Sequence, residues 1–325
     1  MHAIRLHTFG PAENLRYETV DDPVPGPGQV RIAVAAAGVH VVDTSMRRGL
    51  PGPFPLPELP FVPGREVAGT VHRLGPGVDE KWLGTTVVTH LGQTEGGYAE
   101  LAVAAADRLH EVPGGLDPAA AVAMIGTGRT TLGILQFAAL EPGGIAVVTA
   151  AAGGIGTLLV QYLKNAGLTV IGLAGGPEKA DLVAADGADL ALDYRRPGWA
   201  DRIRDRFGDR PATWLFDGVG GETARTAVEL LGKGGTRLVY GWSGGAPLEL
   251  GEDYLTDRGI ASEYVLGPKM LDRAGGIRNL ETTALAEAAA GRLRPAVQRF
   301  PLAEAAAAHR ALETRATVGK VVLMP

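Results

Sequence analysis

Residues 145–156 read IAVVTAAAGGIG, and this stretch decides the fold. Its first four residues form a short apolar run, which is typical of a strand buried on both faces of a parallel sheet. Glycines then permit a sharp turn and let a ligand approach the main chain closely. These glycines are Gly153, Gly154 and Gly156. The stretch therefore predicts a strand followed directly by a glycine turn.

Apolar residues recur at helical spacing after the turn, so residues 155–166, beginning at Ile155, are predicted to form one amphipathic helix. The free amides and positive dipole end of such a helix favour a phosphate, and a dinucleotide pyrophosphate is the usual ligand of a strand, turn and helix in this order. Ala151 stands at the first glycine of the G-x-G-x-x-G spacing, with Gly153 and Gly156 at the other two. The alternative is a structural glycine turn in another α/β protein.

Length and charge restrict the class of protein. A chain of 325 residues exceeds the usual size of one core, so two domains are expected. The formal charge is −5 and no basic stripe occurs, which argues against nucleic-acid binding. No signal-peptide core and no apolar run near the roughly 20 residues of a membrane span are visible, so a cytoplasmic protein that does not enter a membrane is expected. The chain has no cysteine, which rules out a thiolate nucleophile and any Cys-ligated metal.

The order of predicted elements indicates two kinds of domain. Short β-type runs separated by turn signals fill residues 1–122, whereas helices and strands alternate over 123–265, the pattern of a doubly wound parallel sheet. One helix of the second region is predicted at 124–139. Residues 266–325 contain alanine-rich helices and a closing strand at 320–324 that is expected to return to the first domain. The proline-rich segment 51–63 reads either as a surface connection or as an apolar wall of a substrate cleft.

Several of these segments together resemble the medium-chain dehydrogenase/reductase superfamily, specifically its zinc-free quinone oxidoreductase branch. They are GPGQVRIAVAAAGVHVVDTSMRRG, FVPGREVAGTVHRLGPGV, VVTAAAGGIGTLLVQYLKNAGLTVIG, DGVGG and RATVGKVVL. The resemblance implies an α/β protein with a GroES-like β domain (1–122 and 266–325) interrupted by a Rossmann domain (123–265). It also implies an active site in the cleft between the domains and a homodimer formed through the edge of the Rossmann sheet.

The same resemblance predicts a site without metal. The positions that hold catalytic zinc in the alcohol dehydrogenases of the superfamily are His40, Arg65 and Thr127 here. Arginine cannot lose its proton in a protein, so Arg65 cannot ligate zinc. His40 is then either a partly buried, hydrogen-bonded histidine or a residue that touches substrate or cofactor, where it would orient a carbonyl. Asp43 and Glu66 are interpreted as structural partners of Arg47 or Arg65, with an acid/base role as the alternative.

The remaining site residues are assigned to the cofactor. The resemblance places Thr127 and Thr130 at the nicotinamide ribose or phosphate, with helix capping as the alternative. Tyr240 and Trp242 end the fifth Rossmann strand, where open α/β sheets bind ligands, although both could instead be core aromatics.

Cofactor choice follows from the end of the second Rossmann strand, residues 172–176, which includes Gly175 and carries no acidic residue. An acid at this place normally binds the ribose of NADH and would repel the extra phosphate of NADPH. Lys179 can reach that phosphate, or it is merely a solvated helix residue. The resemblance adds Tyr194 and Arg315 as further contacts. NADPH is therefore the predicted cofactor.

The combined prediction is a zinc-independent NADPH-dependent oxidoreductase that transfers hydride to a quinone or a similar conjugated carbonyl of small size. Two alternatives remain open at this stage. One is an enoyl or alkenal reductase of the same superfamily, and the other is a non-catalytic NADPH-binding protein. Quinones are favoured because their reduction leaves an oxyanion that solvent can protonate, whereas an isolated C=C needs a positioned acid.

Overall fold

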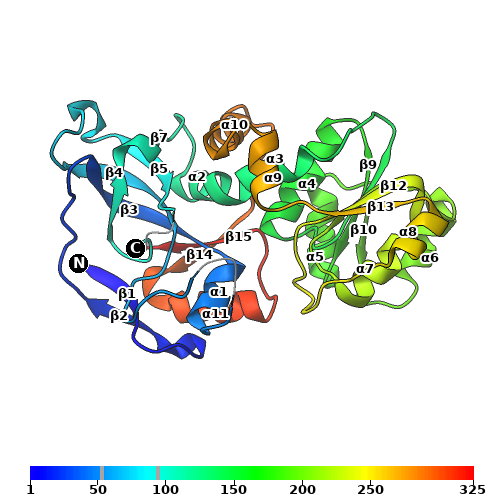
Figure 1. Cartoon of the computed structure of the whole chain (residues 1–325), viewed down its shortest axis with the longest axis horizontal. Helices are drawn as coiled ribbons and strands as arrows, with labels where there is room; N and C mark the ends of the chain where they lie inside the picture. Colours follow the sequence, from blue (N-terminus) through cyan, green and yellow to red (C-terminus); the bar gives the residue numbers. More distant parts are fainter. Residues whose placement is uncertain (52–54, 93–95) are drawn as a thin grey trace. The chain divides into compact units, whose positions relative to one another are not determined.

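The computed structural model describes residues 1–51, 55–92 and 96–325, which form two compact units (Figure 1). The first unit contains Met1–Gly128, Glu281–Ala290 and Pro295–Pro325. The second contains Arg129–Leu280 and Gly291–Arg294. Residues 123–128 thus lie in the first unit and 266–280 in the second, which differs from the boundaries expected from the sequence. Close packing agrees with both assignments. Gly126 packs against Glu66 of the first unit, and Met270 packs against Gly133 of the second, in each case so closely that a Cβ atom on the glycine would overlap the neighbour.

The first unit is built on a seven-stranded sheet with the order β14-β15-β3-β4-β5-β7, in which β6 also pairs with β3, and on a separate β1-β2 hairpin. Alternate residues of β3, such as Val30 and Ile32, are fully buried, as expected for a strand with one face on a core. The strands are β1 (His2–Leu6), β2 (Leu15–Thr19), β3 (Gln29–Val39), β4 (Glu66–Leu74), β5 (Thr86–His90), β6 (Leu101–Ala105), β7 (His110–Glu111), β14 (Val297–Pro301) and β15 (Lys320–Met324). The closing strand therefore does return to the first domain, antiparallel to β3.

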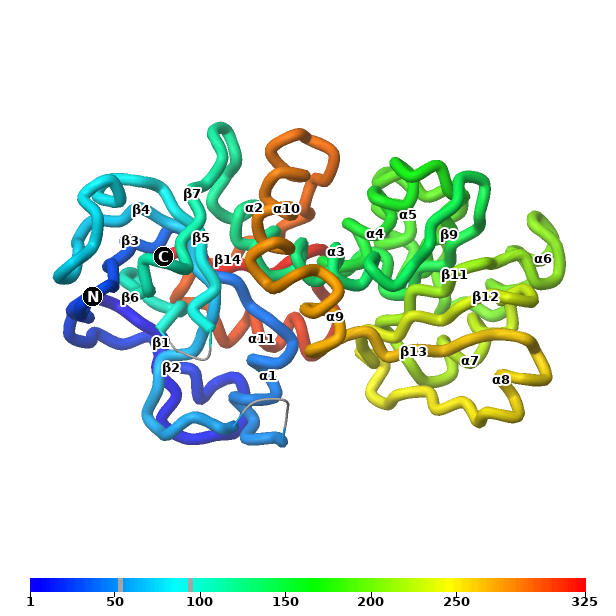
Figure 2. The backbone as a smooth tube through the Cα atoms, turned by 45° about the horizontal axis from the view of Figure 1, so that its top comes forward, coloured from blue at the N-terminus to red at the C-terminus, as the bar shows by residue number. Residues whose placement is uncertain are grey.

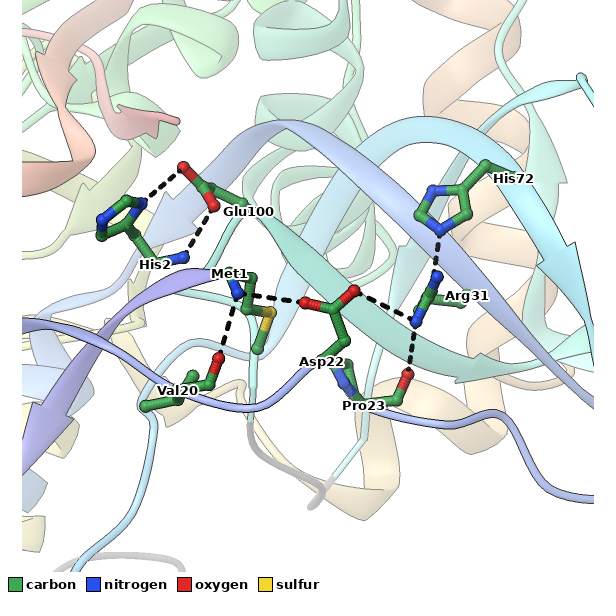
Figure 3. Close-up of polar contacts among 8 residues, drawn as sticks. All are labelled: Met1, His2, Val20, Asp22, Pro23, Arg31, His72 and Glu100. Atoms are coloured by element: carbon green, nitrogen blue, oxygen red, sulfur yellow. Dashed lines mark hydrogen bonds and ion pairs between the residues drawn. The ribbon is translucent and has the colours of Figure 1, made fainter.

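Polar contacts tie the N-terminal hairpin to this sheet (Figure 3). The Met1 ammonium group donates to the Val20 carbonyl and to Asp22, both at 3.0 Å. Arg31 on β3 lies 3.5 Å from Asp22 and donates to His72 on β4 at 2.7 Å. The contacts link β1, β3 and β4, although exposed pairs of this kind add little stability.

Helices of the first unit cover the sheet and carry the start of the site. They are α1 (Val41–Arg47), α2 (Pro118–Ala123) and α11 (Ala305–Glu313), while α10 (Ile277–Ala289) begins in the second unit and continues into the first. Figure 2 shows α11 beside α1, although nearly the whole chain separates them in sequence. Arg47 at the end of α1 is fully buried there and pairs with Glu313 of α11.

The second unit is a parallel six-stranded sheet with the order β10-β9-β8-β11-β12-β13. The order runs outward from β8 in both directions, so right-handed crossovers place helices on both faces, as in a doubly wound fold. Its strands are β8 (Ile145–Val148), β9 (Thr169–Ala174), β10 (Leu190–Asp193), β11 (Ala212–Asp217), β12 (Leu231–Val239) and β13 (Ala261–Tyr264). Its helices are α3 (Arg129–Leu135), α4 (Gly154–Asn165), α5 (Pro177–Ala185), α6 (Trp199–Phe207), α7 (Gly221–Val228), α8 (Glu252–Arg258) and α9 (Pro268–Arg273).

The helix predicted at 124–139 differs from the structure. The chain enters helix α2 already at Pro118, because the Asp117 side chain caps it by accepting from the Ala120 amide at 3.3 Å. A π-helical turn, Met124–Gly128, then joins α2 to α3. Inserted π turns of this kind often mark functional sites. Within the described ranges, no helix combines the length and the apolar content needed to cross a bilayer.

Candidate functional site

Three neighbouring strands of the first unit bring His40, Glu66 and Lys320 together. His40 directly follows β3 and is the N-cap of α1. Glu66 opens β4, and Lys320 opens β15. Both strands run antiparallel to β3, with Ala37 opposite Val67 and Val39 opposite Val321, so their starts lie at the end of β3.

The three side chains are in direct contact. Glu66 Oε1 lies 2.8 Å from His40 Nε2 and 2.5 Å from Lys320 Nζ, and Lys320 Nζ lies 3.1 Å from His40 Nε2. Glu66 is fully buried and the Lys320 side chain is 5 % exposed, whereas 23 % of the His40 side chain reaches the surface of the unit. A Cβ atom at Gly38 or Gly126 would overlap the Glu66 carboxylate, so these two glycines make room for it. We call His40, Glu66 and Lys320 the histidine cluster.

The electrostatics of the histidine cluster favour a charged Glu66. Burial on its own raises the pKa of Glu66, but the His40 and Lys320 charges and the His40 hydrogen bond together outweigh burial, so the net pKa of Glu66 is well below the usual value. Glu66 and Lys320 thus form a buried ion pair whose charges cancel. Removing either partner of such a pair leaves an uncompensated buried charge, which is strongly destabilising.

A second set of contacts fixes the start of α1 behind His40. Asp43 Oδ2 accepts a hydrogen bond from the His40 amide at 2.8 Å and from the Tyr98 hydroxyl at 3.1 Å. Asp43 Oδ1 lies 3.7 Å from Arg65 Nε, which agrees with the structural pairing expected for Asp43. The expected arginine partner of Glu66 is wrong, because Glu66 contacts His40 and Lys320 instead.

The glycine turn of the second unit joins β8 to α4. Gly153 is the N-cap of α4, which begins one residue earlier than predicted. Ala150 has a positive φ of 49°, and a Cβ atom at Gly156 would overlap its carbonyl oxygen. Ala151, at the position of the first glycine, is fully buried and its amide donates to Leu173 on β9. The turn is thus tight and leaves the N-terminal amides of α4 near the strand ends.

A buried polar network supports this turn from β11. Asp217 Oδ2 accepts from Arg237 at 2.6 and 3.0 Å, while Oδ1 accepts from the Thr149 hydroxyl at 3.1 Å. Tyr240 is buried against Gly218 and donates its hydroxyl to the Thr149 carbonyl at 3.1 Å. Burial, helped by the Asp217 charge, raises the pKa of Tyr240. The Tyr240 hydroxyl is therefore engaged within the protein.

The other predicted cofactor residues divide between the units. Gly175 follows β9, Tyr194 follows the adjacent β10, and a Cβ atom at Gly175 would lie 2.9 Å from the Tyr194 hydroxyl. Lys179 lies in the first turn of α5. Arg315 belongs to the first unit, so its meeting with Lys179 and Tyr194 at one phosphate stays a prediction.

Three predicted cofactor residues remain, and they are Thr127, Thr130 and Trp242. Thr127 is buried in the π-helical turn and belongs to the first unit, whereas Thr130 lies on α3 in the second. Trp242 is 44 % exposed, and its ring lies 5.9 Å from that of Tyr264. The segment 51–63, expected to be either a surface connection or an apolar wall of a substrate cleft, includes residues 52–54, which lie outside the described residues. Leu50 and Leu56 beside them are exposed.

Comparison with known proteins identifies the family. A family model described as an alcohol dehydrogenase GroES-like domain matches residues 26–114, and one described as a zinc-binding dehydrogenase matches residues 154–271. A quinone oxidoreductase of Pseudomonas aeruginosa is 33 % identical over 99 % of each chain. A 2-haloacrylate reductase of a Burkholderia species is 32 % identical over 98 % of each chain. The solved quinone oxidoreductase of Escherichia coli, complexed with NADPH, superposes over the whole of both chains with a TM-score of 0.86 at 27 % identity.

The chain belongs to the quinone oxidoreductase branch of the medium-chain dehydrogenase/reductase superfamily. The predicted pairing of a GroES-like domain with a Rossmann domain is thereby confirmed.

One of the matching family models describes a zinc-binding dehydrogenase, which raises the question of whether this chain could hold zinc. Arg65 and Thr127 stand where ligands would be needed, and the described residues hold no group of three His, Asp or Glu side chains suited to a metal ion. The Lys320 ammonium group lies 3.1 Å from His40 Nε2, where it would repel a divalent cation. An arginine that keeps its proton and a nearby lysine ammonium group are unfavourable surroundings for a catalytic zinc.

Two residues of this oxidoreductase were missed in the sequence. Lys320 was read only as the start of a strand, although a lysine beginning the otherwise apolar run KVVLM is a signal for a buried partner. Arg195 follows Tyr194 directly and lies against Gly176, yet no sequence pattern singled it out.

Proposed function

We propose that this chain is a zinc-independent, NADPH-dependent oxidoreductase that delivers hydride to a quinone or a similar conjugated carbonyl. NADPH supplies the hydride when bound. The chain supplies the phosphate-binding turn at Gly153–Gly156, the contacts to the extra phosphate at Lys179, Tyr194 and Arg315, and hydroxyls at Thr127 and Thr130 for the nicotinamide half. Positioning of this kind accounts for a large part of enzymatic rate enhancement.

The histidine cluster is the observation that carries the proposal. His40 Nε2 contacts a carboxylate and an ammonium group whose charges cancel, so the ring is held in place without a metal ion. His40 Nε2 is engaged by Glu66 and Lys320, so the hydrogen bond that orients the acceptor carbonyl is made through Nδ1, the other ring nitrogen, on the partly exposed side chain. Reduction of a quinone leaves a phenolate-like oxyanion, which solvent can protonate, so no further acid is required.

Reduction of an activated C=C is the second candidate, because the similar 2-haloacrylate reductase is named for such a substrate. An acceptor panel decides between the two. We expect NADPH oxidation with benzoquinones and naphthoquinones at a higher kcat/KM than with 2-haloacrylates, enones or crotonyl thioesters. A higher kcat/KM for any of the latter would overturn the quinone assignment, and NADPH binding without turnover of any acceptor would favour a binding protein.

Metal independence has its own test. Elemental analysis of the purified, active protein should find less than about 0.1 zinc per chain, and a chelator should leave the rate unchanged. One zinc per chain that is lost together with activity would refute the proposal.

The assembly and cellular location are also proposals. β13 is an edge strand of the six-stranded sheet, and Tyr264 at its end is 54 % exposed. Exposed strand edges are available for pairing with a second chain, so we place the interface of a cytoplasmic homodimer there. Sedimentation analysis of the wild type should give a dimer, and a Glu263→Pro variant within β13 should shift it toward monomer. A wild type that sediments as a monomer at micromolar concentration would contradict the interface.

A further inference from the structure

The ends of β9 and β10 form a compact platform in the second unit. The strands are parallel neighbours with Ala174 opposite Asp193, so both end at the same level. The Asp193 carboxylate joins the two ends, since its Oδ1 accepts from the Gly176 amide at 2.9 Å and from the Arg195 amide at 3.0 Å. The segments that follow the two strands are thus fixed side by side.

Arg195 lies on this platform with its guanidinium group against the main chain. Its Nε lies 3.3 Å from Asp193 Oδ1, and a Cβ atom at Gly176, where φ is 125°, would overlap Nη2 of the guanidinium group. The Tyr194 hydroxyl packs against Gly175 in the same way that the Arg195 guanidinium group packs against Gly176. A tyrosine hydroxyl and a guanidinium group therefore cover two consecutive residues after β9. These are the residues where a ribose-binding acid would stand in an NADH enzyme.

We propose that Arg195 is a specificity-determining residue that binds the 2′-phosphate of NADPH and so selects NADPH over NADH. The inference deepens the proposed function and rests on its use of NADPH. Asp193 contacts Nε and leaves the two terminal nitrogens of the guanidinium as a fork, the arrangement that binds a phosphate through two parallel hydrogen bonds. The Arg195 side chain is 61 % exposed, so a ligand can reach it.

The competing explanation is that Arg195 only neutralises Asp193. Arg196 provides the matched control, because it is also an arginine beside Asp193 and is 70 % exposed, with its Nε 3.9 Å from Asp193 Oδ2. Arg196 belongs to the same loop and carries the same charge. The guanidinium group that packs against Gly176 on the platform is that of Arg195. A general effect of positive charge would act through both residues, whereas a phosphate contact would act through Arg195 alone.

Calorimetric titration of the full chain tests the assignment without any turnover. The titrants are NADPH, NADH, adenosine 2′,5′-bisphosphate and 5′-AMP, and the proteins are wild type, Arg195→Ala, Arg195→Lys and Arg196→Ala. We expect Arg195→Ala to weaken NADPH and the bisphosphate by about tenfold to a hundredfold, because charged hydrogen bonds to phosphate are lost, with NADH and 5′-AMP changed by less than about twofold. Arg195→Lys should recover part of the loss, and Arg196→Ala should resemble wild type.

The outcomes separate this inference from the proposed function. If wild type prefers NADPH and Arg195→Ala keeps the same preference, or weakens NADH equally, the role of Arg195 is overturned while NADPH use stands. If wild type binds NADH as tightly as NADPH, the proposed cofactor fails and the inference fails with it. An equal loss in Arg196→Ala would also overturn it, because the effect would then be one of general charge.

Discussion

The buried His309 gives the first unit a built-in sensitivity to acid. His309 lies on α11 and is fully buried, with Nε2 3.3 Å from the Tyr98 hydroxyl. Its Nδ1 has no hydrogen-bond partner among the described residues, so a proton there would gain no acceptor. Burial, opposed only in part by the Asp43 charge, lowers the pKa of His309 from 6.5 to about 4. Between pH 6.5 and about 4, His309 is therefore mostly protonated in the unfolded chain and mostly neutral in the folded chain.

The difference between the pKa of His309 in the unfolded and folded chain sets the loss of folding stability. About 2.5 pH units at about 1.4 kcal/mol each give a loss of about 3 kcal/mol as the pH falls from 6.5 to 4, with the stabilisation complete above 6.5. The His309→Leu substitution removes the titrating group, while Tyr98 keeps Asp43 as its acceptor. We expect the variant to lie within about 1 kcal/mol of wild type at pH 7.5 and to exceed it by about 2 kcal/mol or more at pH 4.5.

Urea unfolding followed by circular dichroism at several pH values between 7.5 and 4.5 measures this difference. Carboxyl groups titrate in the same range, but they are common to both proteins, so the difference between the two curves isolates residue 309. A Leu312→Ala variant on α11 is the control, because it removes apolar contacts and no titrating group, so its curve should run parallel to wild type. If wild type and His309→Leu lose stability in parallel, the reasoning from burial is refuted.

Three further outcomes are expected. Lys179→Ala should weaken NADPH by about ten- to a hundredfold in fluorescence titrations and leave NADH nearly unchanged, since one charge-assisted hydrogen bond is worth about 1.5–3 kcal/mol; an equal loss for both cofactors would remove Lys179 from the phosphate. His40→Asn should keep most quinone reduction, because asparagine can donate the same hydrogen bond, whereas His40→Leu should lose about tenfold or more in kcat/KM; an inactive His40→Asn that still binds NADPH would make His40 an acid. Arg237→Leu should cost about 3–5 kcal/mol in thermal unfolding, because it leaves the Asp217 carboxylate buried without its partner, and a loss below about 1 kcal/mol would contradict that pairing.

The parts of the fold that local pattern determines were predicted well. The strand at Ile145–Val148, the glycine turn and the following helix lie where the sequence places them, because apolar spacing and glycine position are local properties. The early start of α2 was missed, although Asp117 followed by Pro118 is a capping signal that the sequence contained.

The candidate site was only partly predictable, because its contacts depend on strand register. His40 was singled out, but its partner Lys320 lies 280 positions away, and only the pairing of β15 with β3 brings the two together. Arg237 lies on β12, and its partner Asp217 comes from the neighbouring strand β11. The local sequence around Lys320 or Arg237 does not identify the partner in either pair. Side chains that meet across a sheet are fixed by tertiary structure, which a single sequence does not reveal.

The position of β15 has a consequence for synthesis of the chain on the ribosome. Lys320, which neutralises the buried Glu66, belongs to the strand that completes the first sheet after the whole second unit has been made. Domains fold largely as they emerge, at about 5–20 residues per second, so the second unit can fold while the first still lacks two neighbouring strands. Until β15 arrives, the edge of β3 is open and Glu66 has no cation. The nascent first unit therefore remains exposed to chaperones and to mispairing until β15 has left the exit tunnel.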